Sequence, residues 1–217
     1  MDPDFWLERW ARGETGFHQS QPHAGLVRHW PSLGLARGAR VFVPLAGKSP
    51  DLHWLAAQGH RVIGVELAGL AVRAFFEEAG LEAVSEPAGR FTRHRCGTLE
   101  LLCGDVFDLD RGTLGEVAAV FDRAALVALP PGLRTAYAAH LTGLTTAGTR
   151  TLLVTLEYDQ SRMAGPPFSV HESEVRALYG AQHRIGLLER RAPPDAARFA
   201  QRGVTDTMEA IYALERC

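Results

Sequence analysis

The chain has 217 residues, which is enough for one α/β domain with a full core and marginal for two. Hydrophobic residues make up 46% of the sequence and charged residues 22%, the ordinary balance of a soluble globular protein. A net charge of −2 provides no electrostatic footprint for nucleic acid or an anionic membrane, and no apolar run approaches the ~20 residues of a membrane span. The short acidic start MDPDFW does not have the pattern of a signal peptide. Three cysteines and nine histidines show no metal-ligand spacing, so we expect no metal site and free thiols in a reducing cytoplasm.

Residues 3–12 are predicted to form a short helix that Asp2 could cap. Trp6 and Trp10 are four residues apart and therefore share one face of this helix. Such an aromatic stripe most often packs a helix onto its domain. The alternative is a lid helix whose indole covers a flat ring or a sulfonium, where cation–π attraction would add ~0.5–2 kcal/mol.

A polar loop, GFHQSQPH, follows the first helix. Phe17 in this loop is equally consistent with a place under the loop and with contact to a ligand. His18 and His23 are expected to be solvated loop residues, because no carboxylate lies close in sequence to orient either ring. Residues 24–33 are predicted to be helical.

Residues 40–66, RVFVPLAGKSPDLHWLAAQGHRVIGVE, predict a buried strand, a tight turn, a helix and a second buried strand. Ser49 is a natural N-cap for the helix, and Gly59 suits the position just after its end. Glu66 stands at the carboxyl end of the second strand, 19 residues after Gly47. This is close to the ~20-residue offset at which an acidic residue accepts hydrogen bonds from ribose hydroxyls. The alternative is that Glu66 only caps a strand or the next helix.

The turn within this unit is poor in glycine. It lacks the G-x-G-x-x-G of dinucleotide sites, and Phe42 occupies the place of the first glycine of a Walker A loop. A cofactor with a ribose but no phosphates would fit such a turn, and S-adenosylmethionine is the common one. Lys48, the only lysine of the chain, also lies here, either for a functional reason or by chance on a surface turn.

The rest of the chain continues the alternation of helices and strands. The predicted elements are a helix over 68–79, a possible edge strand in FTRHR, a strand from 99 to Gly104-Asp105, a strand over 117–123, a helix over 131–145, a strand over 150–158, a helix in HESEVRALYG and a closing antiparallel pair with residues 192–203 as its loop. A mostly parallel seven-stranded sheet with helices on both faces and an antiparallel C-terminal hairpin is the α/β, Rossmann-like architecture of class I methyltransferases. We expect one domain over 1–217, in which residues 1–35 form a helical lid.

Two further strand ends carry candidate ligand contacts. Asp105 could meet an adenine amino group, with Val106 and Phe107 flanking the ring, although a helix cap is equally consistent with the pattern. Arg123 ends a buried strand on the side where such sheets bind ligands. The alternative is an Asp122–Arg123 surface pair worth under ~1 kcal/mol.

Seven motifs also match those of one known family, in its order and along nearly the whole chain. They are FWLERW (5–10), GFHQ (16–19), VFVPLAGKSPDLHWLAAQGHRVIGVE (41–66), LCGDVFDL (102–109), FDRAALVALPP (121–131), LLVTLEYD (152–159) and GPPFSV (165–170). Together they resemble the thiopurine S-methyltransferases, most closely the bacterial branch. The chain departs from the family at Ala46, where cysteine is usual, and at Ala124, where the family has DRGAL and the turn is expected to be stiffer here.

The resemblance implies an S-adenosylmethionine-dependent enzyme and suggests roles for individual residues. Together with the strand ends, it predicts these cofactor-binding residues: Trp6, Trp10, Leu45, Gly47, Glu66, Asp105, Val106 and Arg123. Arg123 is also the predicted catalytic residue. Phe17 resembles a family residue that touches the thiopurine, and Arg198 resembles a second arginine on the substrate side.

The implied reaction is in-line methyl transfer to a sulfur nucleophile. Thiopurine thiols ionise readily near neutral pH, so alignment, which can supply ~7–11 kcal/mol, matters more than a strong base. Bacterial members of that family are associated with selenium and tellurium methylation, so the resemblance also implies a detoxification role. The alternatives are a methyltransferase acting on a carboxylate or hydroxyl, and a non-catalytic protein that binds the cofactor; a nicotinamide dehydrogenase is disfavoured by the missing glycines. We expect a cytoplasmic monomer with a small-molecule thiol as substrate and neither nucleic acid nor membrane as partner.

Overall fold

The computed structural model describes residues 3–15 and 18–217. Asp2, the expected helix cap, and Phe17, the expected substrate contact, lie outside this part of the chain. The chain packs as two compact units, Met1–Phe121 and Asp122–Cys217, called unit one and unit two below. None of the helices within residues 3–15 and 18–217 is both long and apolar enough to cross a lipid bilayer.

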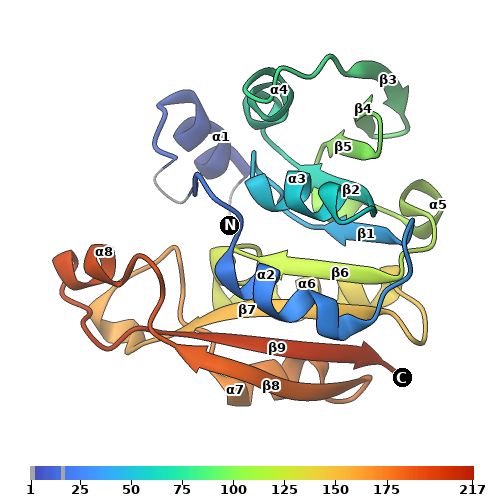
Figure 1. Ribbon diagram of the computed structural model, residues 1–217. Helices are drawn as coiled ribbons and strands as arrows, with labels where there is room; N and C mark the ends of the chain where they lie inside the picture. The colour runs from blue at the N-terminus through green and yellow to red at the C-terminus, as the bar shows by residue number, and fades with distance from the viewer. Residues whose placement is uncertain (1–2, 16–17) are drawn as a thin grey trace. The chain divides into compact units, whose positions relative to one another are not determined.

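Unit one alternates strands and helices (Figure 1). Its elements are α1 (Pro3–Ala11), α2 (Ala24–His29), η1 (Trp30–Leu33), β1 (Arg40–Val43), α3 (Pro50–Ala57), β2 (Arg61–Glu66), α4 (Gly69–Glu77), β3 (Val84–Ala88), β4 (Phe91–Cys96), β5 (Leu99–Cys103), η2 (Val106–Asp108), α5 (Arg111–Leu114) and most of β6 (Ala119–Arg123). The strands lie in the order β3-β4-β5-β2-β1-β6. Those from β5 to β6 are parallel, whereas β3 and β4 are antiparallel additions.

The order of the parallel strands locates the ligand edge of this sheet. The chain runs from β1 to β2 and on to β5, then returns past β1 to form β6. The direction of winding therefore reverses at β1. In open α/β sheets, ligands bind outside the carboxyl ends of the strands at such a reversal. The turn after β1 and the residue that ends β2 both lie at this edge.

Buried strands and one glycine hold this edge together. Residues 41–43 of β1 are at most 4% exposed, as expected for a strand covered on both faces. Gly64 of β2 lies so close to its neighbours that a β-carbon there would approach Leu101 Cδ2 to 2.4 Å and Ala46 Cβ to 2.9 Å. The glycine therefore lets the turn that contains Ala46 pack directly on β2.

The residues predicted to begin and end α3 are confirmed. Ser49 is its N-cap, and the Ser49 hydroxyl oxygen accepts a 3.2 Å hydrogen bond from the Asp51 N–H. Gly59 follows the helix with a φ of 89°, a conformation that glycine adopts without steric cost.

The predicted number of strands was wrong. The described residues form nine strands rather than seven. The FTRHR segment is not an edge strand, because β4 lies between β3 and β5, and β3 forms the edge. No residue of β3 is buried, so this strand lacks the apolar alternation by which it could have been recognised.

Unit two contains the antiparallel part of the fold. Its elements are η3 (Leu126–Ala128), α6 (Pro131–Leu144), β7 (Arg150–Glu157), η4 (Gln160–Arg162), α7 (Glu172–Tyr179), β8 (His183–Arg191), α8 (Ala196–Gln201) and β9 (Met208–Arg216). β9 pairs antiparallel with both β7 and β8, which confirms the predicted C-terminal hairpin.

The segment predicted as a loop, 192–203, contains α8. This helix forms because Phe199 is buried in a cluster with Tyr158, Met163 and Val204.

Candidate functional site

Glu66 is the centre of the candidate site in unit one. It ends β2, is 7% exposed, and uses both carboxylate oxygens. Oε2 accepts the Gly47 N–H at 2.8 Å, and Oε1 accepts the Ala68 N–H at 2.7 Å. Burial raises the pKa of Glu66, and the backbone N–H groups that it accepts act in the opposite direction.

The contact to Ala68 bears on the two interpretations of Glu66. Ala68 is the N-cap residue of α4, so Glu66 does assist the start of the next helix. An ionised carboxylate has about four lone-pair sites, and the N–H groups of Gly47, Ala68 and, more weakly, Leu67 do not fill all of them. The capping contact and the predicted ribose contact are therefore compatible.

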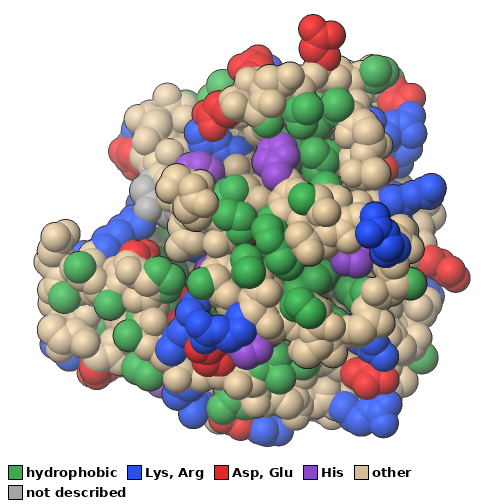
Figure 2. All heavy atoms as spheres, viewed as in Figure 1, with side chains coloured by type: hydrophobic (Ala, Val, Ile, Leu, Met, Phe, Trp, Pro, Cys, Tyr) green, Lys and Arg blue, Asp and Glu red, His purple; other side chains and the backbone are tan. Residues whose placement is uncertain are grey.

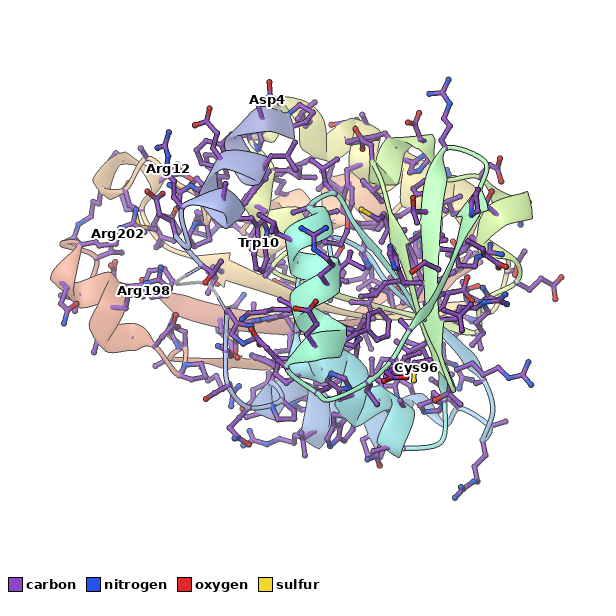
Figure 3. All side chains as sticks on the ribbon, turned by 90° about the horizontal axis from the view of Figure 1, so that it is seen from above. Asp4, Trp10, Arg12, Cys96, Arg198 and Arg202 are labelled. Atoms are coloured by element: carbon purple, nitrogen blue, oxygen red, sulfur yellow. The ribbon has the colours of Figure 1, made fainter. Side chains whose placement is uncertain are left out.

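The turn after β1 is strained and lies against Trp10. Leu45 has a φ of 46° and Gly47 a φ of 55°, and positive φ is rare for leucine. A β-carbon on Gly47 would lie 3.5 Å from Cζ2 of Trp10, so the indole lies against the glycine. Figure 3 labels Trp10 on α1. Trp10 and Glu66 thus both contact Gly47, one through its ring and the other through the amide. Backbone strain of this kind, of order 1–3 kcal/mol, is concentrated at functional sites.

Helix α1, which carries both tryptophans, has no buried residue. Trp6 contacts Phe5 edge-on, with ring centroids 5.3 Å apart, and the Arg9 guanidinium lies 4.6 Å above the Phe5 ring. Trp6 and Trp10 are nevertheless partly buried, and Trp10 lies against Gly47, so this face of α1 packs on unit one without entering its core. Both interpretations of the stripe, packing onto the domain and covering a ligand, are consistent with this position.

The Gly104-Asp105 turn follows β5. Asp105 Oδ1 accepts the Phe107 N–H at 2.9 Å and caps η2, so the helix-cap alternative holds. A β-carbon on Gly104 would lie 2.5 Å from the Phe91 ring, which explains the glycine. Val106 is 7% exposed and Phe107 is 39% exposed. The adenine contact remains a prediction.

Arg123 is partly exposed at the end of β6, and its neighbour Asp122 belongs to unit two. The suggested Asp122–Arg123 surface pair was wrong, because Asp122 is 0% exposed. Its carboxylate accepts the Tyr137 O–H at 2.8 Å and the Leu126 N–H at 3.2 Å. Burial raises the pKa of Asp122 to about 6, although these two hydrogen bonds favour the ionised form. Ala124 has a φ of 61°.

Sequence reasoning missed a buried arginine on α6. Arg134 is 1% exposed; its Nε donates to the Leu129 carbonyl at 2.9 Å, and one terminal nitrogen lies 2.8 Å from each Glu174 carboxylate oxygen. The Phe168 ring centroid lies 5.7 Å from the guanidinium. The sequence does contain a sign of this burial: Arg134 is three residues before Tyr137, so the two share the buried face of the helix.

Two other predictions around the first unit's loops have clear outcomes. His23 was expected to be solvated, but it is 1% exposed and its backbone N–H donates to Asp51 at 2.7 Å. Asp51 is 28 residues away in sequence, which is why no local pattern revealed it. Lys48 forms an ion pair with Glu78, so a structural contact accounts for its place in the turn.

The remaining predicted residue, Arg198, lies on α8 in unit two and is exposed. Arg202 caps the same helix, and Figure 3 labels both side chains. On the face drawn in Figure 2, acidic and basic side chains are interspersed, and neither sign forms a continuous stripe among the residues drawn.

Comparison with known sequences points to one family. The family model described as Thiopurine S-methyltransferase matches residues 1–217. A curated thiopurine S-methyltransferase of Azotobacter vinelandii is 51% identical over 220 residues and covers 100% of both chains. Those of Xanthomonas campestris pv. campestris and Bordetella petrii are 50% and 49% identical over 217 residues, with at least 99% of each chain covered.

Solved structures share the fold at low identity. One is the 1,6-didemethyltoxoflavin-N1-methyltransferase of Burkholderia thailandensis with bound 1,6-didemethyltoxoflavin and S-adenosylhomocysteine; its TM-score is 0.63 at 18% identity, covering 99% of this chain and 87% of that one. A TehB-like SAM-dependent methyltransferase from Corynebacterium glutamicum has a TM-score of 0.58 at 12% identity, covering 99% and 98%. The likeness confirms the predicted Rossmann-like architecture.

Proposed function

Because the chain belongs to the thiopurine S-methyltransferase family, and is therefore an S-adenosylmethionine-dependent methyltransferase, we propose that its methyl acceptor is a sulfur nucleophile. Thiopurine-like aromatic thiols are the proposed substrates, and selenium and tellurium nucleophiles extend the same chemistry. The observation that carries the proposal is the match of the whole chain to relatives named thiopurine S-methyltransferase, and the buried Glu66 carboxylate on the Gly47 turn supports the cofactor on which that reaction depends.

The residues of unit one fit the ribose of this cofactor. The Glu66 carboxylate accepts a backbone N–H on each oxygen and keeps lone-pair capacity for hydroxyl donors. Hydrogen bonds to a charged group contribute ~1.5–3 kcal/mol each. Trp10, which lies against Gly47, offers an aromatic face that attracts a sulfonium. Glu66, Gly47 and Trp10 would therefore hold the cofactor, with Leu45, Asp105 and Val106 as further predicted contacts.

When bound, S-adenosylmethionine supplies an electrophilic methyl group on a positively charged sulfur. The chain does not need a strong general base, because thiopurine thiols ionise readily near neutral pH. Arginine stays protonated in proteins, so Arg123 and Arg198 would favour the thiolate over the neutral thiol. Holding that thiolate in one orientation is the main task of these residues, since alignment can supply ~7–11 kcal/mol.

The first test removes one arginine. Arg123→Ala should lower kcat/KM for an aromatic thiol by about 10²-fold, as expected when one preorganised charged donor is lost. Arg184→Ala is the matched control, because Arg184 is an exposed arginine of the same unit that pairs with Glu215 on the surface. Circular dichroism and thermal unfolding check that both variants are folded. Unchanged kinetics in Arg123→Ala would remove this residue from the site.

The acceptor class is tested with a substrate panel. Aromatic thiols, and the carboxylate and hydroxyl analogues of the same rings, are incubated with S-adenosylmethionine, and the methylated products are identified by mass spectrometry. Methylation of the thiols alone supports the proposal. Methylation of the carboxylate or hydroxyl analogues, or formation of no S-adenosylhomocysteine with any acceptor, would contradict it.

A further inference from the structure

The segment that follows Arg123 is held by several hydrogen bonds from other parts of unit two. The Asp122 side chain accepts the Leu126 N–H at 3.2 Å, and the Val127 carbonyl accepts the Phe168 N–H at 2.7 Å. The Leu129 carbonyl accepts from Arg134 Nε at 2.9 Å. Residues 122–129 are therefore fixed by contacts from within the turn, from α6 and from the loop before α7.

This firm attachment coincides with backbone strain. Ala124 has a φ of 61°, in a region that residues other than glycine seldom adopt. Strain of this kind persists only where the surrounding structure over-determines the conformation, and it is typical of functional sites. The turn next to Arg123 therefore keeps one conformation that the local sequence does not favour.

Asp122 and Arg123 are adjacent at the end of a strand, so their side chains point to opposite faces. Asp122 is 0% exposed and points inward, whereas Arg123 is partly exposed. The hydrogen bonds on the Asp122 carboxylate tie the end of β6, and with it the backbone that carries the arginine, to Leu126 and to α6. The group that holds Asp122 from outside its own turn is the Tyr137 hydroxyl, at 2.8 Å.

Two observations make Tyr137 a permanent donor. It is 0% exposed, and burial together with the Asp122 charge raises its pKa well above 10, so the hydroxyl keeps its proton at all physiological pH values. Tyr179 of α7 also lies near Asp122, and burial together with the Asp122 charge raises its pKa. Within the described chain, however, its hydroxyl donates no hydrogen bond to Asp122. Tyr137 and Tyr179 are the titratable side chains that act on Asp122 from α6 and α7.

We propose that Tyr137 is a positioning residue that, through its hydrogen bond to Asp122, orients Arg123 for the acceptor thiolate. The inference rests on the proposed function of Arg123 and adds a residue that no sequence motif indicated. Tyr137 does not touch the substrate; it acts on the rate only through the arginine. The effect of removing its hydroxyl must therefore depend on whether Arg123 is present.

The test is a double-mutant cycle of Tyr137→Phe and Arg123→Ala, with kcat/KM for an aromatic thiol as the readout. Tyr137→Phe alone should lower kcat/KM about 10-fold. In the Arg123→Ala background, the same change should alter kcat/KM less than about 2-fold. Tyr179→Phe, the matched control that removes a buried hydroxyl near the same carboxylate, should stay within about 2-fold of wild type.

A pH profile separates positioning from general damage. The hydrogen bond from Tyr137 favours the ionised form of Asp122, so its removal raises the Asp122 pKa further. The acid limb of kcat/KM should then move to higher pH in Tyr137→Phe and stay in place in Tyr179→Phe. Affinity for S-adenosylhomocysteine, measured by calorimetry, should remain within about 2-fold in both.

Several results would overturn the inference. One is an equal loss of kcat/KM from Tyr137→Phe in both backgrounds; another is no loss in the wild-type background. If Arg123→Ala alone leaves the kinetics unchanged while thiols are still methylated, the inference fails and the proposed reaction stands. If thiols are not methylated at all, the proposed reaction itself fails. Should Tyr137→Phe not fold, Asp122→Asn replaces it in the cycle and must show the same dependence on Arg123.

Discussion

Two buried carboxylates, Glu66 in unit one and Asp122 in unit two, each hold a strained turn in place, but they accept hydrogen bonds from different donors. Each lies at the end of a strand, and burial raises the pKa of each. Each also braces a turn in which a non-glycine residue has a positive φ, Leu45 near Glu66 and Ala124 beside Asp122. Their donors differ: Glu66 accepts only backbone N–H groups, whereas Asp122 also accepts the Tyr137 hydroxyl.

The difference shows how a buried carboxylate can either bind a ligand or hold the protein's own backbone. Backbone donors hold Glu66 in place and leave lone pairs for hydroxyl groups from outside the chain. Asp122 also accepts one donor on each oxygen, but it is 0% exposed, so no group from outside the protein reaches it. The two carboxylates therefore differ in exposure, 7% for Glu66 and 0% for Asp122, and in the donor from the next helix, because α6 supplies a tyrosine hydroxyl where α4 supplies a backbone amide.

The largest effect should come from Glu66. Glu66→Ala should weaken S-adenosylhomocysteine binding at least about 100-fold, because two charge-assisted hydrogen bonds contribute ~3 kcal/mol or more and ~1.4 kcal/mol corresponds to tenfold in affinity. Calorimetric titration measures the loss. Asp122→Asn is the control from the other unit and should bind within a few-fold of wild type. A wild-type protein that does not bind S-adenosylhomocysteine would contradict the assignment of Glu66.

The second effect concerns stability and pH. The unfolded chain loses the Asp122 proton near pH 3.8 and the folded protein at about pH 6, so between these values the folded state holds more protons. The free energy of unfolding of the wild type therefore falls as the pH rises through this window, by about 3 kcal/mol for this group. Asp122→Asn lacks this proton, so its stability relative to wild type should increase by about that amount between pH 3.5 and 6.5.

Urea unfolding at a series of pH values measures this difference, and contributions that the two proteins share cancel. Glu66→Gln should show a dependence of the same sign, because burial raises the pKa of that carboxyl as well. A difference between Asp122→Asn and wild type that does not change with pH would show that Asp122 titrates at its ordinary value in the folded protein.

The smallest effect should come from relieving the strain beside Asp122. Ala124→Gly removes a steric cost of ~1 kcal/mol, and the added freedom of the unfolded chain opposes this by ~0.4–1 kcal/mol. We expect a gain in unfolding free energy of less than ~1 kcal/mol. Leu45→Gly should instead lose stability, because Leu45 is partly buried and its side chain is also removed. A loss for Ala124→Gly, measured by the denaturant midpoint, would show that the alanine methyl group packs favourably.

Local features of the fold could be predicted because their causes lie within a few residues. Ser49 caps α3 through an atom two residues away, and Gly59 ends it through its own φ. The position of Glu66 also follows from the spacing of one β-α-β unit. The roles of Glu66, Trp10 and the other predicted site residues remain predictions, which the binding measurement above addresses.

Non-local contacts explain what the sequence did not reveal. The Tyr137–Asp122 bond joins residues 15 apart on different elements, and His23 is buried through Asp51, 28 residues away. Helix α8 depends on the burial of Phe199 against side chains from an earlier loop. In each case, the deciding partner has no fixed offset in sequence, so periodicity and capping rules cannot find it.

The edge strand β3 has a consequence for the behaviour of the protein at high concentration. An open strand edge is a template on which other chains can add strands and aggregate. In β3, Pro87 has no N–H to donate, and Glu86 forms an ion pair with Arg95 of the neighbouring strand. A strand that added along β3 would meet a gap in the hydrogen-bond ladder beside a charged pair. This short, charged edge therefore favours solubility over fibrous self-association.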